Sequence, residues 1–206
     1  MTDSITQFIE NTKEVFGNYL NDIDTNDVAK AAAIIIEQET HGNRVHVTGI
    51  GKPGHVAGYA ASLLSSTGTS AYELHGTEAV HGSSGQVKPG DVVIAISNSG
   101  ETAELKATIE TLIHNGARII SCTGNKASWL SKHSEVCLVA GVDAEGDRLN
   151  KAPRNSILAE IMVLQCLSVA LQEKKGLTLE SYLNWHPGGS LGASLRLEKE
   201  KETHHE

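Results

Sequence analysis

The chain has 206 residues, 39% of them hydrophobic and 20% charged, and its formal net charge at pH 7 is −8. This composition excludes wholesale disorder and a fibrous architecture, and the length suits one domain with a sizeable core. The acidic balance and the lack of a Lys/Arg cluster argue against a nucleic-acid partner, because binding to phosphate backbones needs a basic face. A small phosphorylated ligand remains compatible with the acidic net charge, because backbone N–H groups at a helix N-terminus can hold an anion.

The sequence also bears on the compartment. It shows neither a long uninterrupted apolar run nor, in its first residues Met-Thr-Asp-Ser, the basic and apolar regions of a signal peptide. We therefore expect a cytoplasmic protein that does not span a membrane. The three cysteines, Cys122, Cys137 and Cys166, form no C-x-x-C pair, so we expect buried thiols and not a zinc or redox site.

The first forty residues have apolar side chains at helical spacing. Residues 4–40 are predicted to form two helices, separated at 24–26. From Arg44 onward, short β-branched runs alternate with Gly- or Ser-rich loops and helical segments. The predicted strands are 45–50, 70–74, 91–97, 117–122 and 136–139, and the helices between them are 54–66, 101–115 and 126–133.

The run 92–96 is apolar at every position, as expected for a parallel strand covered by helices on both faces. The predicted fold is therefore α/β, a three-layer αβα sandwich with a five-stranded sheet and two N-terminal helices. A long apolar helix at 153–174 begins near Pro153 and ends before Gly176. We divide the chain into N-terminal helices at 1–40 packing on the domain, a main domain at 41–197 and a charged tail at 198–206.

In an open parallel sheet, ligands bind beyond the carboxyl ends of the strands. The loop after the first strand, Gly-Ile-Gly-Lys-Pro-Gly at 49–54, satisfies the pattern G-x-G-x-x-G by letters. Its glycines can equally serve a tight strand-to-helix turn. Lys52 in this loop offers a mobile cation for a phosphate or a substrate oxygen.

The loop after the third strand, Ser-Asn-Ser-Gly-Glu-Thr at 97–102, joins hydroxyl groups to a new helix N-terminus. Its free N–H groups and the helix dipole predict an anion cradle, with helix capping by Asn98 or Ser99 as the alternative. Glu104 follows Glu101 by three residues, so both carboxylates share a helix face. For Glu101 we expect only an interaction with the helix dipole.

Two histidines have polar, glycine-bearing surroundings. His81 lies in Glu-Ala-Val-His-Gly-Ser-Ser-Gly at 78–85, and His186 precedes Pro-Gly-Gly. A histidine before proline does not lie inside a regular helix or central strand, so a functional loop and a merely solvated loop both remain open for His186.

Four segments together resemble the sugar isomerase (SIS) family. They are Gly51-Lys52-x-Gly54-His55, Gly76-x-Glu78-Ala79-x-His81-Gly82, Ile96-Ser97-Asn98-Ser99-Gly100-Glu101 and His186-Pro187-Gly188-Gly189-Ser190-Leu191-Gly192. The similarity covers about 40–195 and is closest to the arabinose-5-phosphate isomerase branch. It implies a parallel SIS-fold sheet, a homotetramer with active sites shared between subunits, and aldose–ketose isomerisation without an organic cofactor. The branch's functional lysine, histidines and glutamates match Lys52, His81, His186, Glu104 and Glu145.

The chain departs from this branch at three places. Pro53 stands where a serine is usual, Ser83 and Ser84 replace an acidic–apolar pair, and Ala-Pro-Arg-Asn-Ser at 152–156 replaces Ala-Pro-Thr-Thr-Ser. These differences leave the identity of the sugar phosphate open. We do not expect the paired CBS modules that often accompany such domains within these 206 residues.

The leading hypothesis is a phosphosugar isomerase that acts through a cis-enediol. Glu104 is the first choice of base and His186 the second, since burial can tune both toward neutral pKa. Lys52 would stabilise the developing oxyanion, His81 would assist ring opening or protonate the carbonyl oxygen, and Glu145 would orient a partner. The candidate ligands of the substrate are Gly51, Ser65, Ser66, Ser97, Asn98, Ser99, Thr102 and Arg154. Arg154 either contacts the sugar phosphate and alters substrate choice or simply solvates the start of its helix.

Other classes remain as alternatives. A non-catalytic sugar-phosphate sensor would keep the cradle but need no base. A nicotinamide-dependent oxidoreductase would use the 49–54 loop with Glu73 as the ribose-binding acid, but it leaves the serine-rich loop unexplained. The ten histidines show no His-x-x-x-His spacing, although His204 and His205 could scavenge a metal. We expect no cofactor and no required metal.

Overall fold

The structure is a computed structural model that describes residues 2–188. Several predicted features lie outside the described residues. They are the end of the His-Pro-Gly-Gly segment from Gly189 onward and the charged tail at 198–206, which includes His204 and His205. Two helices precede the sheet, α1 (Thr2–Asp22) and α2 (Thr25–Thr40). Asp24 separates them and caps α2, because its carboxylate accepts hydrogen bonds from the N–H groups of Asn26 and Asp27.

The sheet has five parallel strands in the order β2-β1-β3-β4-β5. The strands are β1 (Val45–Gly49), β2 (Ala71–Glu73), β3 (Val92–Ile96), β4 (Arg118–Thr123) and β5 (Val136–Val139). The predicted α/β fold and its five strands are confirmed. The bounds of 136–139 are unchanged, and no bound of the other strands moves by more than one residue.

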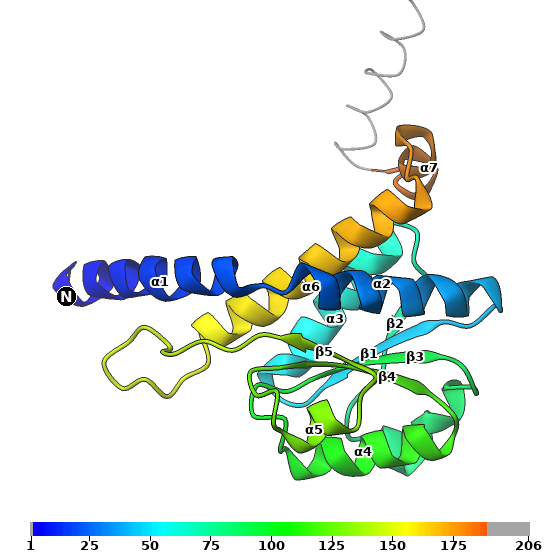
Figure 1. Ribbon diagram of the computed structural model, residues 1–206, viewed down its shortest axis with the longest axis horizontal. Coiled ribbons are helices and arrows are strands. Elements are labelled where there is room, and N and C mark those ends of the chain that lie inside the picture. Colours follow the sequence, from blue (N-terminus) through cyan, green and yellow to red (C-terminus); the bar gives the residue numbers. More distant parts are fainter. Residues whose placement is uncertain (1, 189–206) are drawn as a thin grey trace, which may run out of the picture.

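The helices form two layers around the sheet. The remaining helices are α3 (Lys52–Ser66), α4 (Ala103–His114), α5 (Trp129–Lys132), α6 (Asn155–Lys175) and α7 (Leu179–Trp185), with short 3-10 helices η1 (Ala79–His81) and η2 (Ser83–Gln86). Figure 1 shows α2, α3 and α6 on one face of the sheet and α4 and α5 on the other. Successive side chains of β3 enter the two cores in turn: Val92, Ile94 and Ile96 face α2, α3 and α6, while Val93 and Ala95 face α4.

The chain turns back on itself between β1 and β3. It passes from β1 outward to β2, then returns to β3 on the other side of β1. The loops that follow β1 and β3 therefore diverge at a topological switch point, which is the usual ligand site of a doubly wound sheet.

Helix α1 projects beyond the sheet alongside the segment that precedes α6 (Figure 1). Its inner end is fixed by Tyr19, whose hydroxyl donates to the carbonyl oxygens of Val139 (3.2 Å) and Ala159 (3.0 Å). Nearer its outer end, the amide of Asn11 donates to the carbonyl oxygen of Gly146 (3.0 Å). The division into 1–40, 41–197 and a tail stays a prediction.

Helix α6 is long and apolar enough to cross a membrane by length and composition, a property that a search for uninterrupted apolar runs missed. Half of its most apolar window is buried inside the protein, and the helix packs against α2 and α3. We therefore assign it as a core helix. It ends as predicted at Gly176, whose φ of 61° is the left-handed conformation of a helix C-cap.

Candidate functional site

The loop after β1 is a tight turn that depends on close backbone contact. A Cβ on Gly49 would lie 2.7 Å from the carbonyl carbon of Pro53, and one on Gly54 would lie 3.1 Å from the Gly49 oxygen. Gly51 has a φ of 67° and precedes Lys52, the exposed first residue of α3. The glycines are thus required by the turn itself, which was the structural alternative to dinucleotide binding.

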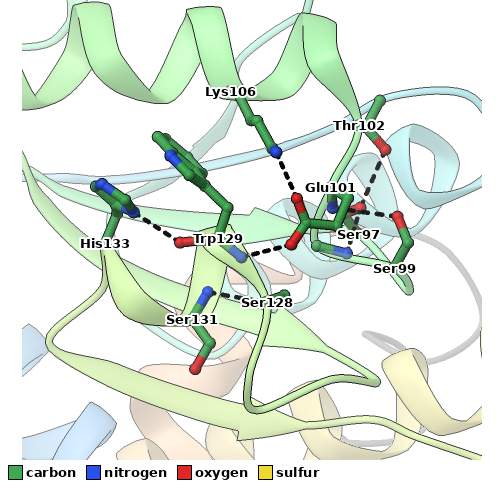
Figure 2. Close-up of polar contacts among 10 residues, drawn as sticks. Ser97, Ser99, Glu101, Thr102, Lys106, Ser128, Trp129, Ser131 and His133 are labelled. Atoms are coloured by element: carbon green, nitrogen blue, oxygen red, sulfur yellow. Dashed lines mark hydrogen bonds and ion pairs between the residues drawn. The ribbon is translucent and has the colours of Figure 1, made fainter.

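The loop after β3 is an ordered set of hydroxyl groups at the start of α4. Ser97 Oγ accepts a hydrogen bond from the N–H of Gly100 (3.1 Å) and lies 3.2 Å from Thr102 Oγ1. Ser99 Oγ accepts one from the N–H of Glu101 (3.2 Å). Figure 2 shows these side chains gathered at one end of the helix.

No side chain among the described residues caps the first turn of α4. Thr102 is the N-cap residue and makes no capping hydrogen bond, so capping by Asn98 or Ser99 is not what the structure shows. The side chain of Asn98 is exposed, while its carbonyl oxygen accepts from Thr123 Oγ1 (3.1 Å) and the N–H of Gly124 (2.9 Å). The positive dipole end of the helix is therefore not occupied by a side-chain cap, which is compatible with the predicted anion cradle.

Glu101 connects the helices α4 and α5. Its carboxylate accepts a hydrogen bond from the N–H of Trp129 (2.7 Å) at the start of α5 and pairs with Lys106 (Figure 2). The bond from Lys106 and then the Trp129 N–H hold the pKa of Glu101 below its ordinary value. The expectation that Glu101 only interacts with the helix dipole missed these partners.

Lys52 and Glu104 lie in the first turns of α3 and α4, and both side chains are exposed. Since β1 and β3 are adjacent and parallel, these two helices begin at the same edge of the sheet. The structure thus brings a cation, a carboxylate and the hydroxyl-rich loop to one edge. These groups can bind an anion, stabilise an oxyanion and accept a proton.

A cavity of about 310 Å³ adjoins the β1 loop on the β2 side. Its polar side chains include His55, Glu73 and His75. Neither histidine was selected as a site residue from the sequence, although each follows the carboxyl end of a parallel strand and could have been found by that criterion. Within residues 2–188, no group of three or more His, Cys, Asp or Glu side chains could hold a metal ion.

Glu145 lies in the segment between β5 and α6 and caps α6. Its Oε2 accepts hydrogen bonds from the N–H groups of Arg154 (2.6 Å) and Ser156 (3.2 Å). The guanidinium of Arg154 forms an ion pair with Asp147 (2.9 Å) in the same segment. This ion pair ties Arg154 to the segment before its helix, and the choice between its two predicted roles stays open.

Two of the predicted substrate ligands lie elsewhere in the chain. Ser65 and Ser66 stand at the C-terminal end of α3, where their hydroxyls donate to the carbonyl oxygens of Ala71 (2.6 Å) and Leu63 (2.8 Å). The 15 residues of α3 span about 22 Å at 1.5 Å per residue, so these serines are a helix length from Lys52. The structure does not bring them into the cradle.

His186 lies near that same far end. The preceding Trp185 packs over Gly68, directly after α3, and His186 Nδ1 lies 2.9 Å from the carbonyl oxygen of Tyr182. His81 ends η1, which packs against α4, and its side chain is exposed. The fold therefore groups Lys52 and Glu104 but leaves His186 at the opposite edge of the sheet.

Comparisons with known proteins agree with this architecture. Residues 40–170 match the model of the SIS domain family. The chain is 40% identical over 178 residues to "Arabinose 5-phosphate isomerase KdsD" of Pseudomonas aeruginosa, which covers 86% of this chain and 54% of that protein. It is 37% identical over 207 residues to the protein of the same name from Francisella tularensis, covering 97% of this chain and 63% of the relative. The chain thus spans roughly half to two thirds of the length of these relatives.

Two solved structures match over nearly their whole length. The E. coli CFT073 protein c3406, in complex with arabinose 5-phosphate, superposes with a TM-score of 0.82 at 34% identity, covering 89% of this chain and 95% of that one. A putative phosphosugar isomerase involved in capsule formation from Bacteroides fragilis gives a TM-score of 0.82 at 30% identity, with 88% and 97% covered. The shared fold, the family match and this identity together show that the chain belongs to the SIS domain family.

Proposed function

We propose that the protein is a phosphosugar aldose–ketose isomerase, which interconverts arabinose 5-phosphate and ribulose 5-phosphate or a related pair. The observation that carries the proposal is the uncapped N-terminus of α4 joined to the hydroxyls of Ser97, Ser99 and Thr102 at the switch point. The relatives named arabinose 5-phosphate isomerase and the structure in complex with that sugar phosphate support this choice of substrate class.

In the proposed reaction, the phosphate is anchored at the cradle and a base moves a proton between C1 and C2 through a cis-enediol. Glu104 is the first candidate for the base, because it stands in the first turn after the phosphate site with an exposed carboxylate. Lys52 stabilises the substrate oxygen that gains negative charge. Glu145, at the start of α6, orients a partner group. The reaction needs no cofactor.

We further propose that His186, the second candidate for the base, and His81 reach the site from other protomers of a homotetramer. The position of His186 near Gly68 supports this, because it stands a helix length from Lys52 within its own protomer. The three free cysteines, which form no disulfide, agree with the reducing cytoplasm as the compartment.

The proposal is tested by incubating the purified protein with pentose and hexose phosphates in D₂O and following the C1 and C2 signals by NMR. Deuterium exchange together with formation of the second sugar phosphate is the expected result. Binding of a sugar phosphate without exchange would instead identify a sensor, and an absence of binding across the panel would overturn both functions.

A further inference from the structure

A cluster of buried polar atoms lies under the first turns of α6. Asn155, Ser156 and Glu160 are each 0% exposed. Among the described residues, Asn155 Oδ1, Ser156 Oγ and both carboxylate oxygens of Glu160 have no hydrogen-bond partner. A buried carboxylate without partners is costly, so the neutral acid is the form of Glu160 that this environment favours.

The surroundings of Glu160 contain no compensating cation among the described residues. The titratable groups that face it are Tyr19 from α1, Cys122 from β4 and Glu145 from the segment before α6. The other two helices packed on α6 contribute apolar residues to this core, among them Ala31 of α2 and Ala57 of α3. Burial, followed by the negative charge of Glu145, raises the pKa of Glu160 to about 8.

Ser156 connects this buried acid to Glu145. Its N–H donates to Glu145 Oε2 (3.2 Å), while its hydroxyl is buried on the side of the core. Ser156 and Glu160 are four residues apart on α6, so their side chains stand one above the other on the same face. The carboxylate of Glu145 is therefore held at the helix N-terminus directly above the turn that contains Glu160.

We propose that Glu160 is a positioning residue: its neutral carboxylic acid adds no negative charge beneath Glu145 and keeps that carboxylate bound to the N-terminus of α6. Ionisation of Glu160 places a second negative charge beneath the first and repels Glu145 from its cap. The catalytic consequence rests on the proposed isomerase function, whereas the coupling between the two carboxyl groups does not.

The coupling is tested without any assay of activity. The infrared C=O stretch of a protonated carboxylic acid is recorded in D₂O across a pH titration for wild type, Glu160→Gln, Glu145→Gln and the exposed control Glu110→Gln. Wild type is expected to show a band at pH 7 that disappears near pH 8 and is absent from Glu160→Gln. In Glu145→Gln its midpoint moves to lower pH, because the neighbouring negative charge is gone, and in Glu110→Gln it does not move.

Either of two results overturns the coupling: no band that depends on Glu160, or the same midpoint with and without the Glu145 carboxylate. If Glu160→Gln does not fold, the comparison of wild type with Glu145→Gln decides alone.

The positioning role is tested by the pH profile of kcat/KM. Wild type is expected to lose activity above the Glu160 midpoint by about tenfold per pH unit, as for one essential ionisation. Glu160→Gln, which cannot ionise, is expected to keep a flat profile through this range whatever its activity at neutral pH. An alkaline limb that is unchanged in Glu160→Gln overturns the role. If wild type isomerises no sugar phosphate, the proposed function fails while the infrared titration still decides the coupling.

Discussion

Two carboxylates stand at the start of α4. Glu101 pairs with Lys106 and accepts from the N–H of Trp129, whereas the carboxylate of Glu104 has no hydrogen bond or ion pair within residues 2–188. We expect Glu104→Gln to preserve folding and sugar-phosphate binding and to lower kcat by a factor on the order of 10² to 10⁴, the usual scale of general acid–base catalysis. Steady-state kinetics and calorimetry on the same preparation measure the two effects. Glu110→Gln, an exposed change on the same helix, should leave both constants near those of wild type. Near-normal turnover in Glu104→Gln would transfer the role of base to His186.

Glu160 also makes the stability of the fold depend on pH. Because its pKa is raised to about 8 in the folded protein from an ordinary value of 4.5, folding binds a proton between these two values. The stability that the protonated Glu160 contributes to folding is fully present below the pKa of this group in the unfolded chain, and it is lost as the pH rises through the pKa of the group in the folded protein. The slope contributed by this group approaches about 1.4 kcal/mol per pH unit.

Urea unfolding at a series of pH values measures that slope. Glu160→Gln should remove it and become the more stable protein relative to wild type at alkaline pH. Equal slopes in wild type and variant would show that Glu160 titrates normally.

At the scale of the element, the β3–α4 loop depends on one glycine. Gly100 has a φ of 65°, and a Cβ there would lie 2.2 Å from Ser128 Oγ. Gly42, with a φ of 80°, has nothing within 4 Å of a Cβ and so provides a matched control for the backbone strain alone. Both alanine variants should lose roughly 1–2 kcal/mol of stability from the left-handed conformation.

Only Gly100→Ala should also weaken phosphate binding, because the loop must move away from Ser128 and take Ser97 and Ser99 with it. Inorganic phosphate titrated into both variants, followed by NMR, distinguishes the two effects. Equal affinity in both would show that the cradle does not depend on this close approach.

The elements of the sheet and its ligand edge were predictable from local patterns. The apolar run 92–96 indicates a doubly covered parallel strand, and strand direction then places the loops at 49–54 and 97–102 at one edge. The same reasoning, carried one step further, would have removed Ser65 and Ser66, since a crossover helix runs back to the amino edge of the sheet. Helix α7 has only seven residues, too few for a periodic pattern, although Thr178 caps it through the N–H of Ser181.

Other features could not be read from local sequence. The environment of Glu160 comes from α1, β4 and the segment before α6, and the position of His186 depends on Trp185 packing over Gly68. Contacts between residues so far apart in the chain leave no periodic signal.

At the scale of the whole molecule, the separation of Glu104 from His186 gives a test of shared sites. If His186 enters a neighbour's site, mixed tetramers of Glu104→Gln and His186→Ala should recover activity that neither variant has alone. Random mixing in equal amounts would give both native residues to about a quarter of the sites. Refolding the variants together and separately, with light scattering to establish the assembly, provides the measurement. A monomer at micromolar concentration, or no recovery in the mixture, would contradict the shared site.

The two tryptophans of the chain are intrinsic fluorescent probes of two different regions of the molecule. The Trp129 ring stacks on His133 with ring centroids 3.9 Å apart, and the backbone N–H of Trp129 donates to Glu101 beside the cradle (Figure 2). Trp185 lies at the opposite edge over Gly68, immediately before His186. In Trp185→Phe, the remaining tryptophan fluorescence comes from Trp129 beside the cradle, and binding of inorganic phosphate should change it. In Trp129→Phe, the fluorescence reports on the surroundings of His186, and if that residue enters a neighbour's site the fluorescence should change when the protein is diluted. The chain thus carries two fluorescent indicators, one for the occupancy of the cradle and one for the proposed contact with a neighbour.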